Sequence, residues 1–531
     1  MNQQLLSAPV CIACGPETAT PPPEAIGFKA HNLARMAALG LAVPPAFVIG
    51  TAWCQQADEL TPAHWLPALA AVEARCGLRF GDPRRPLLLS VRSGAPVSMP
   101  GMLESLLNIG LCDATLPGLL RRSGNPRLAW DAYRRLVAGF GTVVWGLPMA
   151  AFEADLARVA QGRAERELDF LDLRALTRAH LDTLQRLSGR SFPQSPQLQL
   201  QQAIDAVFAS WQSDKARAYR AMKQIDEAMG TAVTVQAMVF GNAGGCSGAG
   251  VGFTRHPSSG VPEPWVDFLF NAQGEDVVSG RRSVAGQALL QDRAPHLWGE
   301  LVEVCRRLEQ ALGDMQDIEF TVEQGKLWML QTRTGKRSVQ AQARIALDLL
   351  DEGLITRDEA LRRSAGLDAK TLALTELVGN GVAPQQAIEP LAWGASASPG
   401  VVVGEIAFDE ARARERHAAG VPVLLLRQDA ETADIAALEL SEGLLTSRGA
   451  RTSHAAVIAR QLGKVCIVGC TALRLDAARG EARIGDRLLR AGEVLTLDGN
   501  TGAVYAGELA LQRRVPDGLL ERLQALRSAS D

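Results

Sequence analysis

The spacing of the hydrophobic residues changes along the chain, and this change constrains the fold more than any other feature of the sequence. Residues 1–110 mix short helical and strand patterns. From about 112 to 228, apolar residues recur at the spacing of amphipathic helices, as in PRLAWDAYRRLVAGF. From 231 the segment TAVTVQAMVFG is rich in β-branched residues and runs into a glycine-rich loop. These changes predict a mixed α+β chain.

The second half of the chain continues this mixture. A helix over 294–312 precedes DIEFTVEQGKLWMLQTR, which predicts two strands joined at Gln324-Gly325. From residue 395 strands and helices alternate, and a hairpin over GEVLTLDGNTGAVYAG closes this region. We therefore expect the following parts: a first domain over 1–335 with a helical insertion at about 112–228, a helical linker over 336–392, a second domain over 393–507, and a C-terminal helix or tail over 508–531.

Composition narrows the class of protein. A chain of 531 residues is too long for one hydrophobic core, so several domains are expected. The net charge of −3 comes from well-mixed charges, which argues against a nucleic-acid or membrane partner. We find neither a basic, apolar leader nor an uninterrupted apolar run of membrane-spanning length. The nine cysteines then indicate reduced thiols and a cytoplasmic protein, and Cys11-x-x-Cys14 alone is weak support for a zinc site.

One histidine lies in an unusual setting. In LTSRGARTSHAAVIARQLGKVCIVG a strand ends near Leu445, and a helix begins near Thr452–His454 and stops at Gly463. Thr452 or Ser453 suits the N-cap, so His454 falls in the first helical turn. Free N–H groups and the helix dipole there favour a phosphorylated side chain, and imidazole is a good nucleophile. The alternative is a packed, inert histidine at a helix start.

Other segments suit phosphate. Arg92, at the end of the strand in RRPLLLSVRSGA, could bind phosphate with two donors. The glycines of 241–252, Gly245 and Gly248 among them, would let backbone N–H groups approach a triphosphate, although an ordinary turn explains many such segments. Lys29 lies just ahead of an amphipathic helix and could bind phosphate or simply be solvated.

Two carboxylates suggest a metal site. Asp317 and Glu319 are two apart on a predicted strand, so they share a face, and Mg²⁺ between them would relieve their repulsion. Gln331 and Arg333 share a face of the neighbouring strand in the same way. A solvated acidic and polar strand face is the competing interpretation.

These motifs together resemble the pyruvate phosphate dikinase family and, more distantly, phosphoenolpyruvate synthase and rifampin phosphotransferase. The resemblance covers roughly residues 25–507. Its most specific pieces are these: SVRSGAPVSMPGMLESLLNIGL, DAYRR, MVFGNAGGCSGAGVGFTRHPSSG, NAQGEDVVSG, DMQDIEFTVEQGKLWMLQTRTGKR, ASPGVVVGEI and TSHAAVIAR. It implies an ATP-grasp nucleotide-binding domain followed by a swivelling α/β phosphohistidine domain.

The resemblance also implies roles for individual residues. His454 falls on the phosphorylated histidine of the family. The family's nucleotide, metal and phosphate positions fall on these residues: Lys29, Arg92, Asp317, Glu319, Gln331 and Arg333. Gln236 and Met238 fall on the strand that lines the adenine. ATP, Mg²⁺ and phosphate are the implied ligands, and AMP and pyrophosphate the implied products.

The sequence departs from the family in three places. Only 24 residues follow Gly507, whereas the acceptor barrel of the family needs about 250. The family's GGKG is GFKA at 27–30, and we expect Phe28 and Ala30 to stiffen and crowd this loop. Arg451 stands three residues before His454, where the family motif has methionine, and it could hold phosphate or suit a different docking partner.

The sequence therefore predicts a dikinase-like phosphotransferase that phosphorylates His454. The acceptor is then pyruvate, if a separate phosphoenolpyruvate/pyruvate-binding chain supplies the barrel. The alternatives are a kinase for another small-molecule acceptor and a non-catalytic, ATP-binding regulatory protein. A homodimer is one expected assembly.

Overall fold

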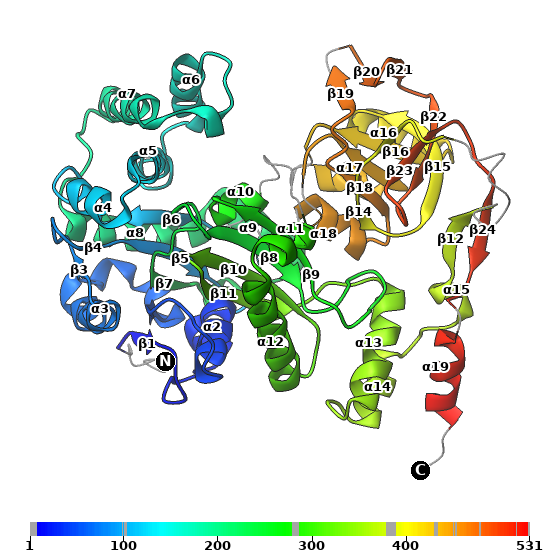
Figure 1. Cartoon of the computed structure of the whole chain (residues 1–531), viewed down its shortest axis with the longest axis horizontal. Coiled ribbons are helices and arrows are strands. Elements are labelled where there is room, and N and C mark those ends of the chain that lie inside the picture. Colours follow the sequence, from blue (N-terminus) through cyan, green and yellow to red (C-terminus); the bar gives the residue numbers. More distant parts are fainter. Residues whose placement is uncertain are drawn as a thin grey trace. The chain divides into compact units, whose positions relative to one another are not determined.

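The computed structural model shows a mixed helix and sheet protein whose contacts divide it into two units (Figure 1). The first unit comprises residues 1–247 and 321–332, and the second comprises 248–320 and 333–531. The structure describes these residues: 8–97, 99, 103–278, 286–378, 389–429, 434–449, 451, 454–476, 479–516 and 518–528. Within these ranges no helix combines the length and apolarity that crossing a membrane would require.

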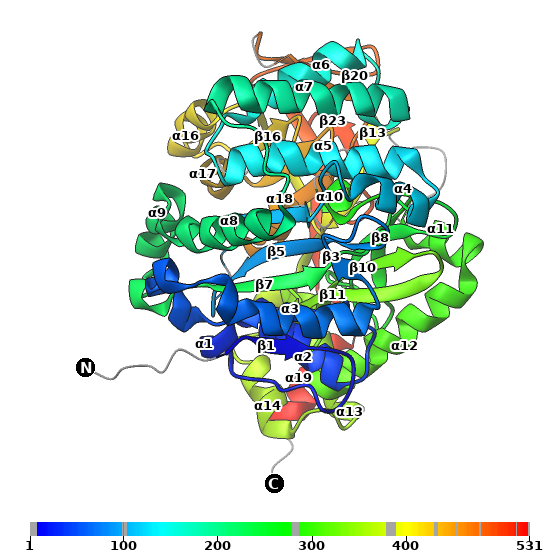
Figure 2. The same ribbon diagram turned by 90° about the vertical axis from the view of Figure 1, so that its left-hand side faces the viewer.

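A five-stranded sheet in the order β1-β2-β7-β5-β6 is the centre of the first unit. Helix α8 packs on β5, β6 and β7, whereas α3 packs on β1 and β2 (Figure 2). The sheet and its neighbours have these bounds: β1 Val10–Ile12, α1 Pro23–Ile26, α2 Phe28–Ala38, β2 Ala46–Ile49, α3 Pro62–Cys76, β5 Leu89–Gly94, β6 Ser105–Ile109, α8 Pro196–Ala209 and β7 Ala232–Ala237. A short parallel pair, β3 Arg79–Phe80 and β4 Pro86–Leu87, lies apart from this sheet.

The stretch predicted to be helical, about 112–228, consists of helices joined by turns and contains no strand. Its α-helices are α4 Leu116–Ser123, α5 Pro126–Val143, α6 Met149–Ala160, α7 Phe170–Ser188, α8 and α9 Asp214–Lys223. Asn125, Asp169 and Ser195 cap α5, α7 and α8 with side-chain oxygens, as expected for residues at helix N-termini. The long helices α5 and α7 lie side by side (Figures 1 and 2).

A second sheet has the order β11-β10-β8-β9. It contains β8 Gly248–Phe253, β9 Trp265–Phe270, β10 Gln316–Glu323 and β11 Lys326–Thr334, and the ends of β10 and β11 around their turn are counted with the first unit. The predicted turn is confirmed, since Gln324 and Gly325 both have positive φ, as in the tight turns that join twisted strands. The helices between β9 and β10 are α10 Gly274–Val278, α11 Gly286–Arg293 and α12 Pro295–Leu312.

The segment that follows is helical only at first. It forms α13 Val339–Asp351, α14 Arg357–Arg363, α15 Ala369–Leu372 and then strand β12 Leu374–Leu377. This strand pairs antiparallel with β24 Leu511–Arg514, and α19 Leu519–Ser528 follows. Both the linker and the tail therefore contain a strand that we did not predict, because the pairing partner of each lies more than 130 residues away in the sequence.

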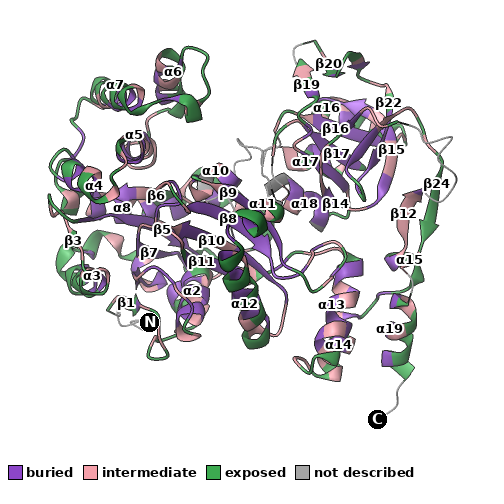
Figure 3. Ribbon diagram, in the orientation of Figure 1, coloured by how far each residue is buried: buried purple, intermediate pink, exposed green. Residues whose placement is uncertain are grey.

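The region that carries His454 is built on an eight-stranded sheet in the order β13-β23-β22-β15-β16-β17-β18-β14. Its strands β15 to β18 are parallel, and α16, α17 and α18 connect them. The bounds are β13 Ala392–Trp393, β14 Ala395–Ser398, β15 Val401–Ala407, α16 Glu410–Ala418, β16 Val423–Arg427, α17 Ile435–Glu439, β17 Gly443–Thr446, α18 His454–Gln461, β18 Val465–Val468, β22 Val494–Asp498 and β23 Ala503–Ala506. Buried residues concentrate in these strands (Figure 3).

A small antiparallel sheet separates β18 from the closing hairpin. It consists of β19 Leu473–Asp476, β20 Glu481–Ile484 and β21 Arg487–Arg490. The predicted hairpin over 492–507 is confirmed, because β22 and β23 pair antiparallel from Leu495 opposite Ala506 to Asp498 opposite Ala503.

Candidate functional site

The first turn of α2 lies against the end of β5. Gly27 precedes the helix with φ +77°, and a Cβ at this position would lie only 1.9 Å from the carbonyl oxygen of Gly94. The amide of Phe28 donates a hydrogen bond of 2.9 Å to the carbonyl oxygen of Ala95. Only glycine permits so close an approach of the two backbones. This close backbone contact holds Lys29, the second residue of α2, beside the end of β5.

The structure corrects our expectation about GFKA. Lys29 lies inside the first helical turn, not ahead of it, and Phe28 and Ala30 are helical as well. Ala30 is fully buried, so it packs the helix onto the unit and does not crowd a loop. Among these residues there is no loop to stiffen, because the backbone is already regular.

Arg92 and Gln236 lie on one face of the first sheet. In the register of β5 and β7, Arg92 is opposite Thr234 and Ser90 is opposite Gln236, and opposite residues of an antiparallel pair project to the same side. Arg92 is half-buried. Gln236 is 2% exposed, and its Nε2 donates to the carbonyl oxygen of Pro44 at 3.1 Å. Its amide therefore anchors a neighbouring loop, a role that the sequence did not indicate.

Met238 lies one residue beyond β7. Its amide donates to the carbonyl oxygen of Leu88 at 2.9 Å, and its side chain packs, partly buried, against the core of the first unit. Lys29, Arg92, Gln236 and Met238 thus all lie on α2 or on the neighbouring strands β5 and β7 and the residue that follows β7.

The glycine-rich segment is not one loop. Gly245 lies in a turn with φ +56° and open space around it, as a phosphate-binding turn requires. Gly248, however, begins strand β8, where a Cβ would lie 2.2 Å from the ring of Phe268. Gly250 is two residues further along the strand, and a Cβ there would lie 2.3 Å from the ring of Phe320. Our prediction of a loop up to 252 was wrong, and aromatic packing explains these later glycines.

The predicted carboxylate pair lies on β10. Asp317 is 9% exposed and accepts a hydrogen bond of 2.7 Å from Nε of Arg333 on β11. Burial raises the pKa of Asp317 and the charge of Glu319 adds to the rise, while Arg333 and Arg460 oppose it. The pKa of Arg333 is also raised, since Asp317 and Glu319 together outweigh the effect of its own burial. Gln331, 6% exposed, lies two residues before Arg333 on the same strand.

These carboxylates are suited to a magnesium ion that also binds phosphate. Within the described ranges, no group of three or more His, Cys, Asp or Glu side chains could hold a metal ion alone, and Cys11 and Cys14 are exposed free thiols. Mg²⁺, however, is commonly held by one or two carboxylates with phosphate oxygens completing its shell. The raised pKa of Asp317 means that its charge lacks full compensation, and a cation would supply it.

Helix α18 begins at His454, as predicted. It follows parallel strand β17, and the loops after β16 and β17 meet there, because the amides of Ser447 and Arg448 donate to the carbonyl oxygens of Arg427 and Gln428. The start of α18 therefore lies at the carboxyl edge of the parallel strands, where open α/β sheets bind ligands. The helix ends before Gly463, whose φ of +67° suits a C-terminal glycine.

The predicted N-cap residues, Thr452 and Ser453, lie outside the described residues, as does the side chain of His454.

Arg460, near the other end of α18, is a residue whose importance we did not predict. It is 3% exposed and donates from Nε to the carbonyl oxygen of Ala397 at 3.0 Å. Burial lowers the pKa of its guanidinium to about 10. Its charge and that of Asp317 shift each other's pKa, so the histidine-bearing helix and the carboxylate strand lie close enough to interact electrostatically. Arg460 is the last residue of the motif TSHAAVIAR, and this position was the sequence signal that could have indicated its importance.

Comparison with known proteins agrees with this architecture. The sequence matches the family described as pyruvate phosphate dikinase, AMP/ATP-binding domain, over residues 58–293 and 285–353. It also matches the PEP-utilising enzyme, mobile domain, over residues 420–502. The first match covers more than half of the chain. The chain belongs to the pyruvate phosphate dikinase family.

Two relatives are themselves named as pyruvate, phosphate dikinases. The chain is 43% identical to pyruvate, phosphate dikinase 2 of Zea mays over 498 residues, which is 92% of this chain and 56% of the relative. It is 41% identical to the chloroplastic pyruvate, phosphate dikinase of Flaveria pringlei over 518 residues, 95% of this chain and 53% of the relative. The chain thus spans about half the length of the curated relatives it matches.

Proposed function

We propose that this protein is a dikinase-like phosphotransferase that uses ATP and Mg²⁺ to phosphorylate His454. The observation that carries the proposal is that Arg460 of α18 and Asp317 of β10, in one compact unit, lie close enough for each charge to shift the pKa of the other. A histidine at the start of α18 needs a metal–nucleotide site nearby to receive a phosphoryl group. Family membership supports the same chemistry, and we propose that residues up to 335 form an ATP-grasp domain.

In the proposed reaction, an imidazole nitrogen of His454 attacks the β-phosphorus of ATP. The bond to the α-phosphate oxygen breaks and AMP leaves, so that the pyrophosphoryl group is on the histidine. Inorganic phosphate then attacks the terminal phosphorus and leaves as pyrophosphate, and one phosphoryl group remains on His454. Transfer of this group to an acceptor regenerates the free imidazole.

The chain's residues would act mainly by positioning charge. Lys29, Arg92 and Arg333 supply fixed positive charges, which stabilise the oxygens of a transferring phosphoryl group. Asp317 and Glu319 would hold Mg²⁺, which neutralises phosphate charge when bound. Gln331 would add a polar contact to phosphate. Gln236, Met238, Gly245 and Gly248 would line the nucleotide, with Gly248 acting through the position of β8 and not through a loop.

The proposal is tested with [β-³²P]ATP. Wild-type protein with Mg²⁺ should gain acid-labile label and release AMP, whereas His454→Ala should gain none. His417→Ala is the matched control, because His417 is an exposed histidine on α16 of the same eight-stranded-sheet region. Asp317→Asn should lower labelling at least about a hundredfold by removing a metal ligand. No label on the wild type, or equal label on His454→Ala, would end the proposal.

The final acceptor is a separate question. Pyruvate is the proposed acceptor when a phosphoenolpyruvate/pyruvate-binding barrel is supplied, on a longer form of the chain or on a second chain, and another small molecule is the alternative. Adding such a barrel with pyruvate should turn single labelling into continuous AMP release. Binding of ATP without AMP formation under every condition would instead favour the regulatory protein.

The remaining proposals concern the setting of the enzyme. We propose a cytoplasmic homodimer, and we note that the relative from Flaveria pringlei is named chloroplastic. Cell fractionation and sedimentation of the purified chain test these two points.

A further inference from the structure

Arg451 immediately precedes the segment that leads into α18, and it is tied to strand β9. Its Nε and Nη2 donate to Oδ1 of Asp267 at 3.1 and 2.7 Å. Asp267 is 1% exposed, so this is a charge pair with one member almost completely removed from water. Truncating one member of such a pair is costly, because the buried charge of the other loses this ion pair.

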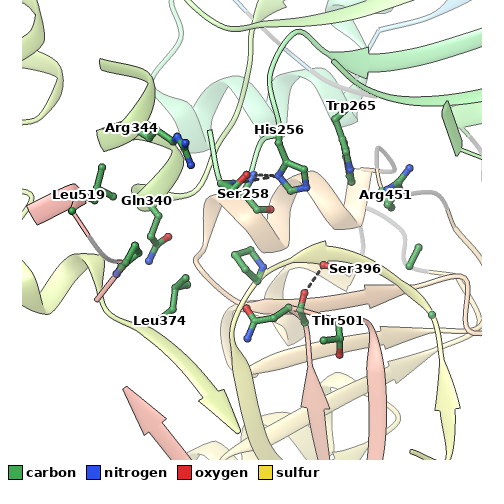
Figure 4. A pocket seen from close by; sticks show the side chains of 18 of the residues that line it. His256, Ser258, Trp265, Gln340, Arg344, Leu374, Ser396, Arg451, Thr501 and Leu519 are labelled. Carbon is green, nitrogen blue, oxygen red and sulfur yellow. Dashed lines mark hydrogen bonds between the residues drawn. The ribbon is translucent and has the colours of Figure 1, made fainter. Parts of the chain in front are cut away.

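The same guanidinium also covers an aromatic ring. It lies 4.0 Å from the ring centroid of Trp265, which is two residues before Asp267 on β9 and therefore on the same face (Figure 4). Arginine suits this double contact, since its planar group can stack on a ring and donate hydrogen bonds at its edge. Lysine could form the ion pair without the stacking, and methionine could form neither.

Arg460 supports the segment that carries Arg451. Its Nη2 donates to the carbonyl oxygen of Arg451 at 3.4 Å, and its guanidinium lies 5.9 Å from the centroid of Trp265. Two arginines of the histidine-bearing region thus converge on one tryptophan. One of them is fixed within its own region by Ala397, and the other reaches Asp267.

The geometry decides between the two roles that the sequence left open for Arg451. Arg451 and Trp265 line one side of a cavity of about 720 Å³, whose other lining residues include Ser396 and Thr501 (Figure 4). An anion in this cavity would have to compete with Asp267 for the guanidinium. Because Asp267 is so deeply buried, the cost of losing this ion pair would oppose that exchange. The contacts therefore favour docking over phosphate binding.

We propose that Arg451 is a positioning residue, an intramolecular latch that holds the start of α18 against β9 during phosphorylation of His454. This inference rests on the proposed function for its kinetic consequence, whereas the contacts of the latch involve only residues of this chain. The latch consists of Arg451, Asp267 and Trp265. It favours the docked arrangement, and it must open before a phosphohistidine can move to a distant acceptor.

Hydrogen–deuterium exchange without ATP tests the latch directly. In Arg451→Met, the peptides covering 262–271 and 454–463 should exchange at least about tenfold faster, a change of about 1.4 kcal/mol in the opening equilibrium. The exchange rate of Arg451→Lys should lie between those of the wild type and Arg451→Met. Arg474→Met is the matched control, because Arg474 is exposed on β19 and its substitution removes the same charge from the same region. Unchanged exchange in Arg451→Met, with normal circular dichroism, overturns the proposal.

Single-turnover labelling tests the kinetic consequence. At saturating ATP, Arg451→Met should phosphorylate His454 about tenfold more slowly than wild type, with the ATP concentration for half-maximal rate unchanged. Asp267→Asn should have a similar effect, and the double variant should be no slower than Arg451→Met alone, because the two residues act as one pair. Two results would instead assign Arg451 to anion binding and overturn the latch. One is a double variant whose loss of labelling rate is the sum of the two single losses. The other is a higher phosphate concentration needed by Arg451→Met without faster hydrogen–deuterium exchange.

The two proposals fail in different ways. Faster exchange in Arg451→Met, with no label on any protein, keeps the latch and ends the phosphotransferase proposal. Label on the wild type, with the exchange and the labelling rate unchanged in Arg451→Met, keeps the phosphotransferase proposal and ends the latch.

Discussion

The second unit contains two arginine clusters, which make similar contacts but connect different parts of the unit. Arg255 is 2% exposed and donates to Glu309 of α12 and to Glu352 just after α13. Arg451 and Arg460 contact Asp267, Trp265 and the carbonyl oxygen of Ala397. The residues of the first cluster all come from the part of the chain that runs from the end of β8 to the residue after α13. The second joins the histidine-bearing region to β9.

The two clusters differ in which buried charges would lose an ion pair if the cluster opened. Arg255 bonds to two carboxylates, with Asp348 only 3.9 Å away, so opening would separate the buried guanidinium from the buried carboxylate of Glu309. Arg451 has one carboxylate partner among the ion pairs of the described residues, and its side chain is already 23% exposed. A cluster of the first kind stabilises the fold, whereas a cluster of the second kind can open and close.

The largest expected effect follows from removing the first cluster. Arg255→Met should lower the free energy of unfolding by about 3–5 kcal/mol, because the carboxyl group of Glu309, 8% exposed, would lose its ion-pair partner. Urea unfolding monitored by tryptophan fluorescence measures this loss. Arg306→Met, which breaks an exposed pair with Glu303 on α12, should change stability by less than about 1 kcal/mol. Equal effects of the two variants would contradict the comparison.

A smaller effect is expected at Arg460. Arg460→Met should cost about 1–3 kcal/mol in urea unfolding, because the buried carbonyl oxygen of Ala397 loses its donor while an unfavourable buried charge is also removed. The same change should raise the pKa of Asp317 further, since Arg460 lowers it. Titration of the Asp317 carboxyl by nuclear magnetic resonance would reveal the second effect, and a lower pKa would refute the proximity of α18 and β10.

The smallest expected effect is a dependence on pH near the latch. The pKa of His256 is lowered, first by burial and then by the charges of Arg451 and Arg460. The unfolded chain, with the ordinary value of 6.5, therefore binds the proton more readily than the folded chain, and stability is lost as pH falls from 6.5 towards the folded pKa. Between about pH 7 and about pH 5, the free energy of unfolding of the wild type, measured by urea unfolding, should fall more than that of His256→Asn. The asparagine oxygen can still accept the amides of Ser258 and Ser259, as Nδ1 does. An identical loss in both proteins would show that folding does not lower the pKa of His256.

Local patterns predicted much of this protein correctly. Helix α18, strand β17 and the hairpin of β10 and β11 follow from spacing and turn residues, which act over a few positions. The pairing of β12 with β24 could not be predicted, because each strand is short and its partner is remote. The glycines of β8 were mistaken for a loop for a related reason, since the rings of Phe268 and Phe320 that require them belong to other strands.

By itself, the sequence predicted the elements of a phosphate site: a histidine at a helix start, two carboxylates on one strand face, and cations that suit phosphate. These are local properties of residue type and spacing. Only the tertiary structure decided that Lys29 lies in a helix clamped by Gly27, that Arg460 acts on Asp317, and that Arg451 pairs with Asp267. The physical reason is that burial and charge pairing depend on which distant segments share a low-dielectric interior, and hydrophobic periodicity does not encode those partners.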